Sequence, residues 1–212
     1  MKKNRLEAFS DGVFAIVITL LILEVKLPEV SYDHLFDGLQ AMMPSIGVYV
    51  QSFLLIGMYW VFHHYAFTFI SEVDGVLLWL NILFLLFISF LPFPTSLLGR
   101  YSFQTWPAVI YGMNLVLANL MGFVMILYLR KNKQLSSPIF TDKIYKSQMR
   151  MYLGVNGLYI FCIALAFVVP KLSVYIFAIM AIFLITRSII FMGVGKCNIP
   201  FAYHHSKVED EH

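Results

Sequence analysis

One carboxylate stands at the start of the first apolar segment of the chain. Asp11 follows Ser10 and precedes an apolar run over residues 13–23 that only Thr19 interrupts. An ionised carboxylate near the middle of a membrane costs roughly 2.5 to 3.5 kcal/mol on insertion scales, so it needs a polar partner or a water-filled cavity. Asp11 is therefore a candidate for a functional or assembly-critical residue.

Polar residues that can partner Asp11 occur at a similar depth in the next two apolar segments. Trp60 and His63 come near the end of the second segment, and Asn81 near the start of the third. Since a helix rises 1.5 Å per residue, these side chains lie in the same half of the membrane. Residues three or four apart share a helix face, which places Trp60 beside His63 or His64. We predict an interhelical hydrogen-bond cluster made by Ser10, Asp11, Trp60, His63 and Asn81.

Other chemistry at these residues has less support. A proton relay between Asp11 and His63, as in a proton-coupled secondary transporter, is the alternative function. No metal site is expected, because the adjacent His63 and His64 point about 100° apart on a helix and cannot chelate one ion together. No nucleophile and base open to a substrate pocket. We therefore expect neither an enzyme nor a bound cofactor.

The composition is that of an integral membrane protein. Of the 212 residues, 60% are hydrophobic and only 13% are charged, which is far from a soluble composition. Six apolar segments, each long enough to cross about 30 Å of hydrocarbon, are predicted at roughly 5–27, 40–66, 75–98, 105–129, 147–169 and 171–193. The predicted fold is all-α, with a six-helix transmembrane domain over residues 1–200 and a polar cytoplasmic tail over residues 201–212.

The distribution of basic residues predicts the topology. Six spans return both termini to one side, and of the 15 Lys and Arg residues all but Lys26, Arg100 and Lys171 fall on that side. Cytoplasmic loops are enriched in Lys and Arg, so both termini are expected in the cytoplasm. Because these residues are spread over loops and form no patch, the net charge of +3 does not indicate nucleic-acid binding.

Prolines and loop residues refine the spans. Pro44 predicts a kink or a restart early in the second span, and Pro92 and Pro94 predict a break near the outer end of the third. The stretch 130–150 is expected to form the one substantial cytoplasmic loop, whose basic residues contact lipid headgroups.

Three motifs carry a resemblance to a known family. They are Arg5-x-x-x-Phe9-Ser10-Asp11, then Tyr59-Trp60-x-x-His63-His64, and finally Asn81 followed by Ser89-Phe90-Leu91-Pro92-Phe93-Pro94-Thr95. Together they resemble the transmembrane protein 175 family, the endosomal and lysosomal potassium channels and their bacterial relatives. Eukaryotic members carry two six-helix repeats, whereas this chain has one copy of the first motif. It therefore resembles the bacterial arrangement, in which four subunits form a pore.

The resemblance implies a potassium-permeable channel in a bacterial plasma membrane. The permeant ligands would be potassium and other monovalent cations, the protein would be a homo-oligomer, most simply a tetramer, and the first helix of each subunit would line the pore within the lipid bilayer. In such a channel a set of residues holds the pore helix in place: Arg5, Phe9, Ser10, Asp11, Trp60, His63, His64 and Asn81. The sequence has no Thr-Val-Gly-Tyr-Gly filter, so selectivity would arise elsewhere.

One arc of the first helix would supply the pore lining. At 100° per residue, Gly12, Ile16, Thr19, Leu20 and Leu23 share this arc. The resemblance implies that Ile16, Leu20 and Leu23 form a hydrophobic constriction that gates by dewetting, and that Thr19 adds a ring of hydroxyls for selectivity. The competing interpretation is an ordinary buried helix in which Thr19 bonds its own backbone one turn back.

Overall fold

The computed structural model describes the backbone of residues 2–195 and the side chains of residues 2–186. Within these residues it is all-helical, with α1 Lys3–Leu20, α2 Leu35–Phe67, α3 Gly75–Phe90, α4 Pro92–Arg100, α5 Thr105–Lys131, α6 Asp142–Ala166 and α7 Pro170–Gly195. Short 3-10 turns cover Leu21–Glu24, Tyr32–His34 and Lys133–Leu135. The predicted tail over residues 201–212 lies outside the described residues.

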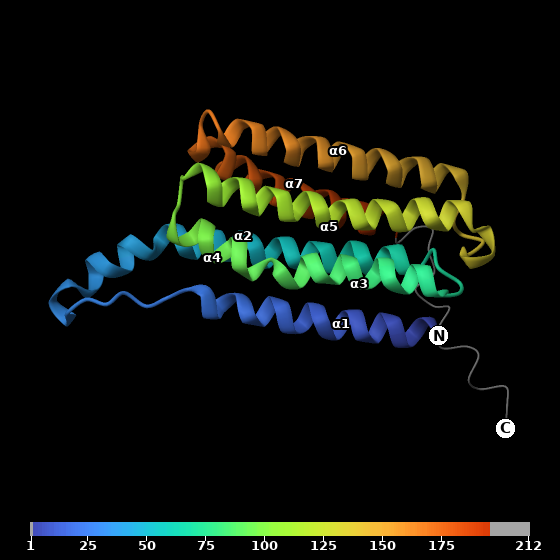
Figure 1. Ribbon diagram of the computed structural model, residues 1–212, viewed down its shortest axis with the longest axis horizontal. Coiled ribbons are helices and arrows are strands. Elements are labelled where there is room, and N and C mark those ends of the chain that lie inside the picture. Colours follow the sequence, from blue (N-terminus) through green and yellow to red (C-terminus); the bar gives the residue numbers. More distant parts are fainter. Residues whose placement is uncertain (1, 196–212) are drawn as a thin grey trace, which may run out of the picture.

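Six segments of this bundle cross a membrane. Five are long and apolar enough by themselves: Lys3–Glu24, Tyr32–Phe67, Gly75–Arg100, Thr105–Lys131 and Asp142–Ala166. The sixth is α7, which is apolar over Pro170–Thr186. The segments run side by side along the long axis, and the connections gather at the two ends (Figure 1). The predicted all-α, six-span membrane fold is confirmed.

The prolines act differently in the second and third spans. α2 begins at Leu35 and continues through Pro44, so Pro44 does not restart the span. The turns before it run obliquely to the rest of α2 at the left of Figure 1, which agrees with a proline kink. The third span is broken as predicted, because α3 ends at Phe90 and α4 begins at Pro92.

Side chains satisfy the backbone where the third span breaks. Pro92 has no N–H to donate, so carbonyls near it lose their helical partners. Phe87 O has lost its usual donor, because Leu91 N donates to Ile88 O, and Asn114 Nδ2 donates to Phe87 O at 3.0 Å. Leu91 O keeps Thr95 N as its helical donor and also accepts from Thr95 Oγ1 at 2.8 Å. Leu91 itself keeps helical dihedrals, φ −58° and ψ −33°. The break therefore remains inside one continuous membrane-crossing segment.

The expected cytoplasmic loop over residues 130–150 is shorter than predicted. α5 extends to Lys131 and α6 already begins at Asp142. The reason is a helix cap, since Thr141 Oγ1 accepts a hydrogen bond from Ile144 N at 3.4 Å. Arg150 consequently lies on α6 and not in a loop.

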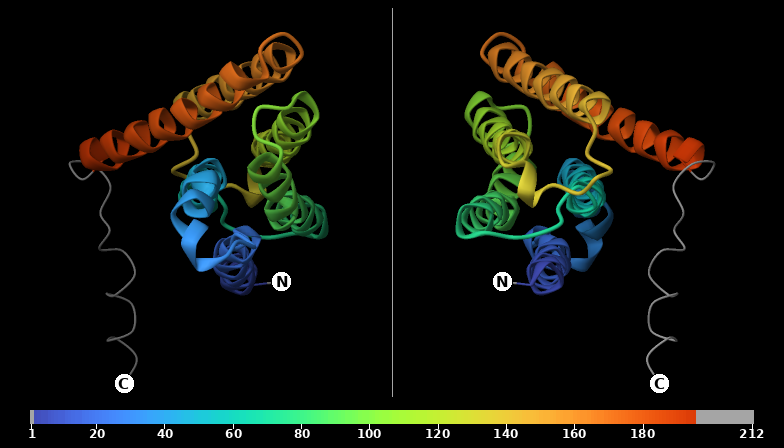
Figure 2. Two further views of the ribbon diagram at one scale, coloured as in Figure 1. Left: turned by 90° about the vertical axis from the view of Figure 1, so that its left-hand side faces the viewer. Right: turned by 90° about the vertical axis from the view of Figure 1, so that its right-hand side faces the viewer.

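α1 occupies an edge of the bundle. It packs against α2 and α3, and it lies on the side opposite α6 and α7 (Figure 2). Its buried side chains recur every three or four residues and belong to Leu6, Ser10, Phe14 and Val17. One face of α1 therefore meets its own subunit, while the opposite face has no neighbour within the described chain.

A candidate pore-lining helix and its anchoring contacts

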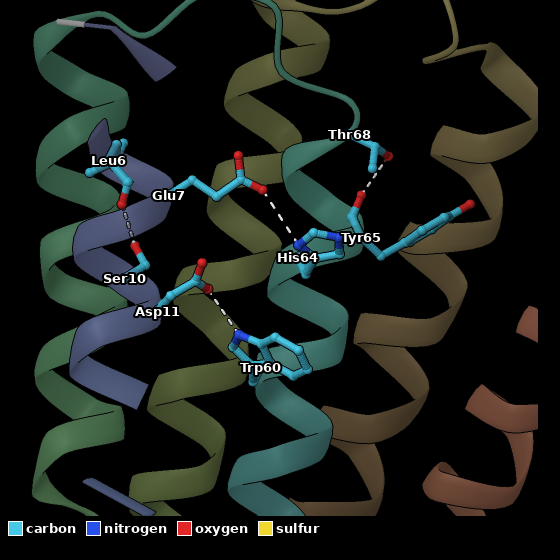
Figure 3. Close-up of polar contacts among 8 residues, drawn as sticks. All are labelled: Leu6, Glu7, Ser10, Asp11, Trp60, His64, Tyr65 and Thr68. Carbon is cyan, nitrogen blue, oxygen red and sulfur yellow. Dashed lines mark hydrogen bonds and ion pairs between the residues drawn. The ribbon is translucent and has the colours of Figure 1, made fainter. Parts of the chain in front are cut away.

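Two side-chain contacts, one helical turn apart, join α1 to α2. Trp60 Nε1 donates a hydrogen bond of 2.9 Å to Asp11 Oδ1, and His64 Nδ1 lies 3.4 Å from Glu7 Oε1. Glu7 and Asp11 are one helical turn apart on α1, and both point toward α2 in Figure 3. Trp60 and His64 are one turn apart on α2 and stack on each other, with ring centroids 6.1 Å apart. Two antiparallel helices thus match at two successive turns.

A second, buried chain of hydrogen bonds joins α1, α3 and α2. Ser10 Oγ donates to Leu6 O at 2.9 Å, and Asn81 Nδ2 donates to Ser10 Oγ at 3.0 Å. Asn81 Oδ1 lies 2.8 Å from His63 Nε2. The side chains of Ser10 and Asn81 are completely buried and His63 is 5% exposed. In a low-dielectric interior such a chain fixes the relative rotation of the helices that carry it.

Aromatic rings hold the His63 imidazole in this orientation. It stacks on Phe84 of α3, with centroids 5.4 Å apart and an interplanar angle of 11°. Phe67 of α2 and Phe14 of α1 approach it to centroid distances of 4.4 Å and 5.5 Å. His63 therefore has little freedom to rotate toward Asp11.

The residues of the predicted cluster lie in two separate hydrogen-bonded groups. Asp11 pairs with Trp60, and His63 pairs with Asn81; no hydrogen bond between Asp11 and His63 occurs among the described residues. Glu7 was missed by the sequence reasoning. The available signal was its spacing, because Glu7 precedes Asp11 by four residues just as Trp60 precedes His64.

Arg5 and Phe9 belong to the same predicted set but face outward. Arg5 is exposed and Phe9 is 55% exposed, and within the described part of this chain neither side chain makes a hydrogen bond, ion pair or ring contact. Both lie on the side of α1 that also carries Gly12 and Ile16, because positions 5, 9, 12 and 16 follow one another at intervals of three or four residues. Arg5 and Phe9 are therefore free to contact a molecule other than their own subunit.

The exposed face of α1 is an apolar stripe with one hydroxyl. Ile16 is 60% exposed, Leu20 is 44% exposed and Leu23 is 62% exposed. Leu23 lies in the 3-10 turn that follows α1, and this turn keeps it on the open side. A Cβ added at Gly12 would meet nothing within 4 Å. All five residues of the predicted arc are exposed.

Thr19 lies on this exposed face and also bonds its own helix. Its Oγ1 donates to Ile16 O at 2.8 Å and lies 3.1 Å from Ala15 O. The backbone contact of the competing interpretation is therefore present, but the helix is not buried on this side. A hydroxyl carries one proton and two lone pairs, so the oxygen can still accept a further contact from outside the helix.

Comparison with known proteins places this geometry in a family. The model of the endosomal/lysosomal potassium channel TMEM175 family matches residues 5–92, which include both anchoring groups. A protein of Chryseobacterium sp. (strain P1-3) named as a potassium channel is 33% identical over 186 residues, covering 86% of this chain and 92% of the relative. A chicken relative named as the endosomal/lysosomal proton channel TMEM175 is 36% identical over 111 residues, 48% of this chain and 22% of the relative.

A solved structure shares the fold over nearly the whole length. It is the crystal structure of a lysosomal potassium-selective channel TMEM175 homologue from Chamaesiphon minutus, with 31% identity and a TM-score of 0.79. The match covers 88% of this chain and 97% of that one. The motif region, the full-length bacterial relative and the shared fold agree, and they place the protein among channels and not among enzymes. The chain belongs to the endosomal/lysosomal potassium channel TMEM175 family.

Proposed function

We propose that this protein is one subunit of a homo-oligomeric, potassium-permeable channel whose pore is lined by α1. The observation that carries the proposal is the exposed stripe of Ile16, Thr19, Leu20 and Leu23 on a helix at the edge of the bundle. The names of the bacterial relatives support potassium as the permeant ion. Family membership also speaks against the alternative of a proton-coupled secondary transporter.

A ring of subunits would bury this stripe around a central axis. Four copies, as in a tetramer, bring four α1 helices together while α6 and α7 face the lipid, because these helices lie on the opposite side of the subunit (Figure 2). Arg5 and Phe9 then contact a neighbouring subunit near the start of α1. Their exposure in the single chain supports this role.

The aliphatic residues of the stripe form the constriction. Ile16, Leu20 and Leu23 occupy successive turns, so a ring of subunits would stack up to three apolar rings along the axis. A narrow apolar section loses its water and blocks ions, which makes it a gate. Opening then requires only that α1 tilt enough for water to enter.

Thr19 supplies the selective contact in this proposal. Its hydroxyl lies between Ile16 and Leu23 along the helix, and its proton is already given to the Ile16 carbonyl. The oxygen lone pairs remain for an ion that has shed part of its hydration shell. Potassium holds its hydration water less tightly than sodium does. A ring of hydroxyl oxygens therefore offsets more of the dehydration cost for potassium than for sodium.

The anchoring contacts set which face of α1 meets the axis. Asp11 to Trp60 and Glu7 to His64 hold α1 against α2, and Ser10 to Asn81 holds it against α3. Two attachments in different directions prevent rotation about the helix axis. A structural role for Asp11 and His63 is favoured over proton transport, because the hydrogen bond of His63 goes to Asn81, whose carboxamide is not a titrating carrier.

Charge and the bacterial relatives support the membrane and the orientation that we propose. Lys26, Arg100 and Lys171 lie near the end of the bundle opposite the N-terminus of α1, and the α5–α6 connection with Arg130 and Lys133 lies at the same end as that N-terminus (Figure 1). Basic residues favour the cytoplasm. We place the protein in a bacterial plasma membrane with both termini cytoplasmic.

Ion flux in liposomes tests the proposal. The purified full chain is reconstituted, and potassium, sodium and proton fluxes are measured separately with and without an opposing potential. The expected result is potassium flux that exceeds sodium flux and reverses at the potassium equilibrium potential. Potassium movement that requires a stoichiometric proton gradient would instead establish the transporter. No potassium flux above protein-free liposomes would reject the channel.

A further inference from the structure

The buried series of hydrogen bonds runs from Ser10 through Asn81 to His63. At the His63 end, one ring nitrogen lacks a hydrogen-bond donor among the described residues. Ser10 gives its single proton to Leu6 O, so it accepts from Asn81 Nδ2. Asn81 therefore presents its oxygen to His63, and an amide oxygen can only accept, which requires the His63 proton on Nε2. A neutral imidazole with this tautomer has an acceptor at Nδ1. That atom is buried and has no partner among the described residues.

His63 also lines a cavity in the interior of the bundle. The cavity has a volume of about 30 Å³ and is lined by residues of α2, α3, α5, α6 and α7, with Met58, Met125 and Val155 among its apolar walls. A polar cavity needs on the order of 10–15 Å³ to hold one water molecule, which must find two to four polar partners. The space is too small for a lipid chain or a drug-sized molecule.

Tyr152 supplies a second polar group in the same cavity. Its hydroxyl end lies against Gly122, since a Cβ added there would fall 2.9 Å from the Tyr152 oxygen. No side chain in the described part of the protein bonds this hydroxyl. Asn119, also in the cavity wall, donates through Nδ2 to the Tyr152 carbonyl at 3.1 Å and so fixes this part of α6 against α5. His63, whose Nδ1 lacks a donor, and Tyr152, whose hydroxyl lacks a partner among the described residues, thus line the same cavity.

We propose that this cavity is a binding site for one ordered water molecule, which donates to His63 Nδ1 and contacts the Tyr152 hydroxyl. The water supplies the missing donor and locks the Nε2–H tautomer that Asn81 requires. It thereby connects α6 to α1 through His63, Asn81 and Ser10. This inference concerns the interior of the single subunit and does not depend on which ion crosses the pore.

The experiment is solid-state NMR on the full chain in liposomes at pH 8, with ¹⁵N-labelled histidine. His63 is identified by the signal that disappears in His63→Gln, and His64, which is exposed on the surface of the subunit, serves as an internal comparison. The expected result is His63 protonated at Nε2, with magnetisation transfer from a slowly exchanging water to Nδ1. A proton on Nδ1 in the wild type, or no transfer from water, overturns the proposal.

Cavity variants separate this water from water in the pore. Val155→Phe adds a ring that fills the cavity and should abolish the transfer to His63, whereas the matched Leu153→Phe places the same ring on the outer face of α6, where Leu153 is 59% exposed, and should leave it unchanged. Tyr152→Phe, which adds no volume, should reduce the transfer at least twofold and serves if Val155→Phe fails to fold. Undiminished transfer in Val155→Phe, or in Tyr152→Phe, overturns the proposal.

Discussion

Asp11 accepts a hydrogen bond from Trp60, a residue 49 positions later in the chain, and this contact ties α1 to α2. The bond length is 2.9 Å, and Trp60 is 42% exposed. A carboxylate in an apolar helix thus finds its polar partner in an indole N–H. The Glu7 to His64 contact repeats the attachment one turn nearer the N-terminus.

Substitution of Asp11 tests this attachment. Asp11→Ala removes a hydrogen bond to a charged acceptor and should lower the stability of the folded subunit by about 1.5 to 3 kcal/mol. Asp11→Asn keeps an acceptor oxygen and should lose less. Thermal unfolding and the elution volume of the solubilised oligomer are the measurements. In combination with Trp60→Phe the effects should be less than additive; strict additivity would mean that the two side chains do not interact.

Polar substitution in the apolar stripe tests the constriction. Ile16→Asn, Leu20→Asn and Leu23→Asn should each let water persist in the narrow section and raise the basal flux of several monovalent cations. Leu153→Asn, on the outer face of α6, is the control and should leave flux unchanged. The measurement is cation flux in liposomes at equal protein density. Wild-type flux in all three stripe variants would place the constriction on other residues.

Thr19 variants test selectivity. A tenfold preference for potassium over sodium corresponds to about 1.4 kcal/mol, which is within the range of a single hydrogen-bond-sized contact. Thr19→Ala and the nearly isosteric Thr19→Val should both reduce the preference by about that factor, while Thr19→Ser, which keeps the hydroxyl, should preserve most of it. Reversal potentials under biionic potassium and sodium report the ratio. Normal selectivity in Ala and Val variants would leave Thr19 with only its backbone contact.

Cysteine cross-linking tests whether α1 faces α1 in the assembly. In a background with Cys162→Ser and Cys197→Ser, an Ile16→Cys chain should form covalent dimers under mild oxidation, because the stripes of neighbouring or opposite subunits meet at the axis. A Leu153→Cys chain should remain monomeric on a denaturing gel, since α6 faces lipid. Equal cross-linking at both positions would indicate random collision in place of a defined pore.

Asp74 at the start of α3 should make stability depend on pH in the acid range. Burial raises the pKa of this carboxyl, but hydrogen bonds from the Tyr128 hydroxyl at 2.5 Å and from Leu77 N at 2.9 Å outweigh that effect and hold the pKa below its ordinary value. A depressed pKa means that the carboxylate stabilises the fold above its unfolded-state pKa, about 3.9, and that this is lost as pH falls through the folded value.

Thermal unfolding as a function of pH measures this contribution. Asp74→Ala removes the cap and should cost about 0.5 to 2 kcal/mol at neutral pH. Asp74→Asn keeps a capping oxygen and should lie between Asp74→Ala and the wild type at pH 7. The difference between wild type and Asp74→Asn should shrink below about pH 4. A difference that stays constant from pH 7 to pH 3 would contradict the charged cap.

Local features of the sequence were enough to determine the helices and their faces. Hydrophobic length reveals a membrane span, and helical periodicity places Gly12, Ile16, Thr19 and Leu20 on one arc, because both depend only on neighbouring residues. The depth of Asp11 and of the second-span polar residues followed from the rise per residue. The predicted positions of the helix ends were less accurate. The cap at Thr141 and the continuation of α2 through Pro44 depend on small energy differences within single helical turns.

Only the tertiary structure decided which polar side chains meet. The sequence placed Asp11, Trp60 and His63 in one predicted cluster without assigning pairs. The fold pairs Asp11 with Trp60, His63 with Asn81 and His64 with Glu7. The reason is rotational. A turn of α2 by one residue changes the direction of its side chains by about 100°, and that rotation is set by packing across α1, α2 and α3, where Phe14, His63 and Phe84 interlock. The outward position of Arg5 and Phe9 likewise follows from this packing.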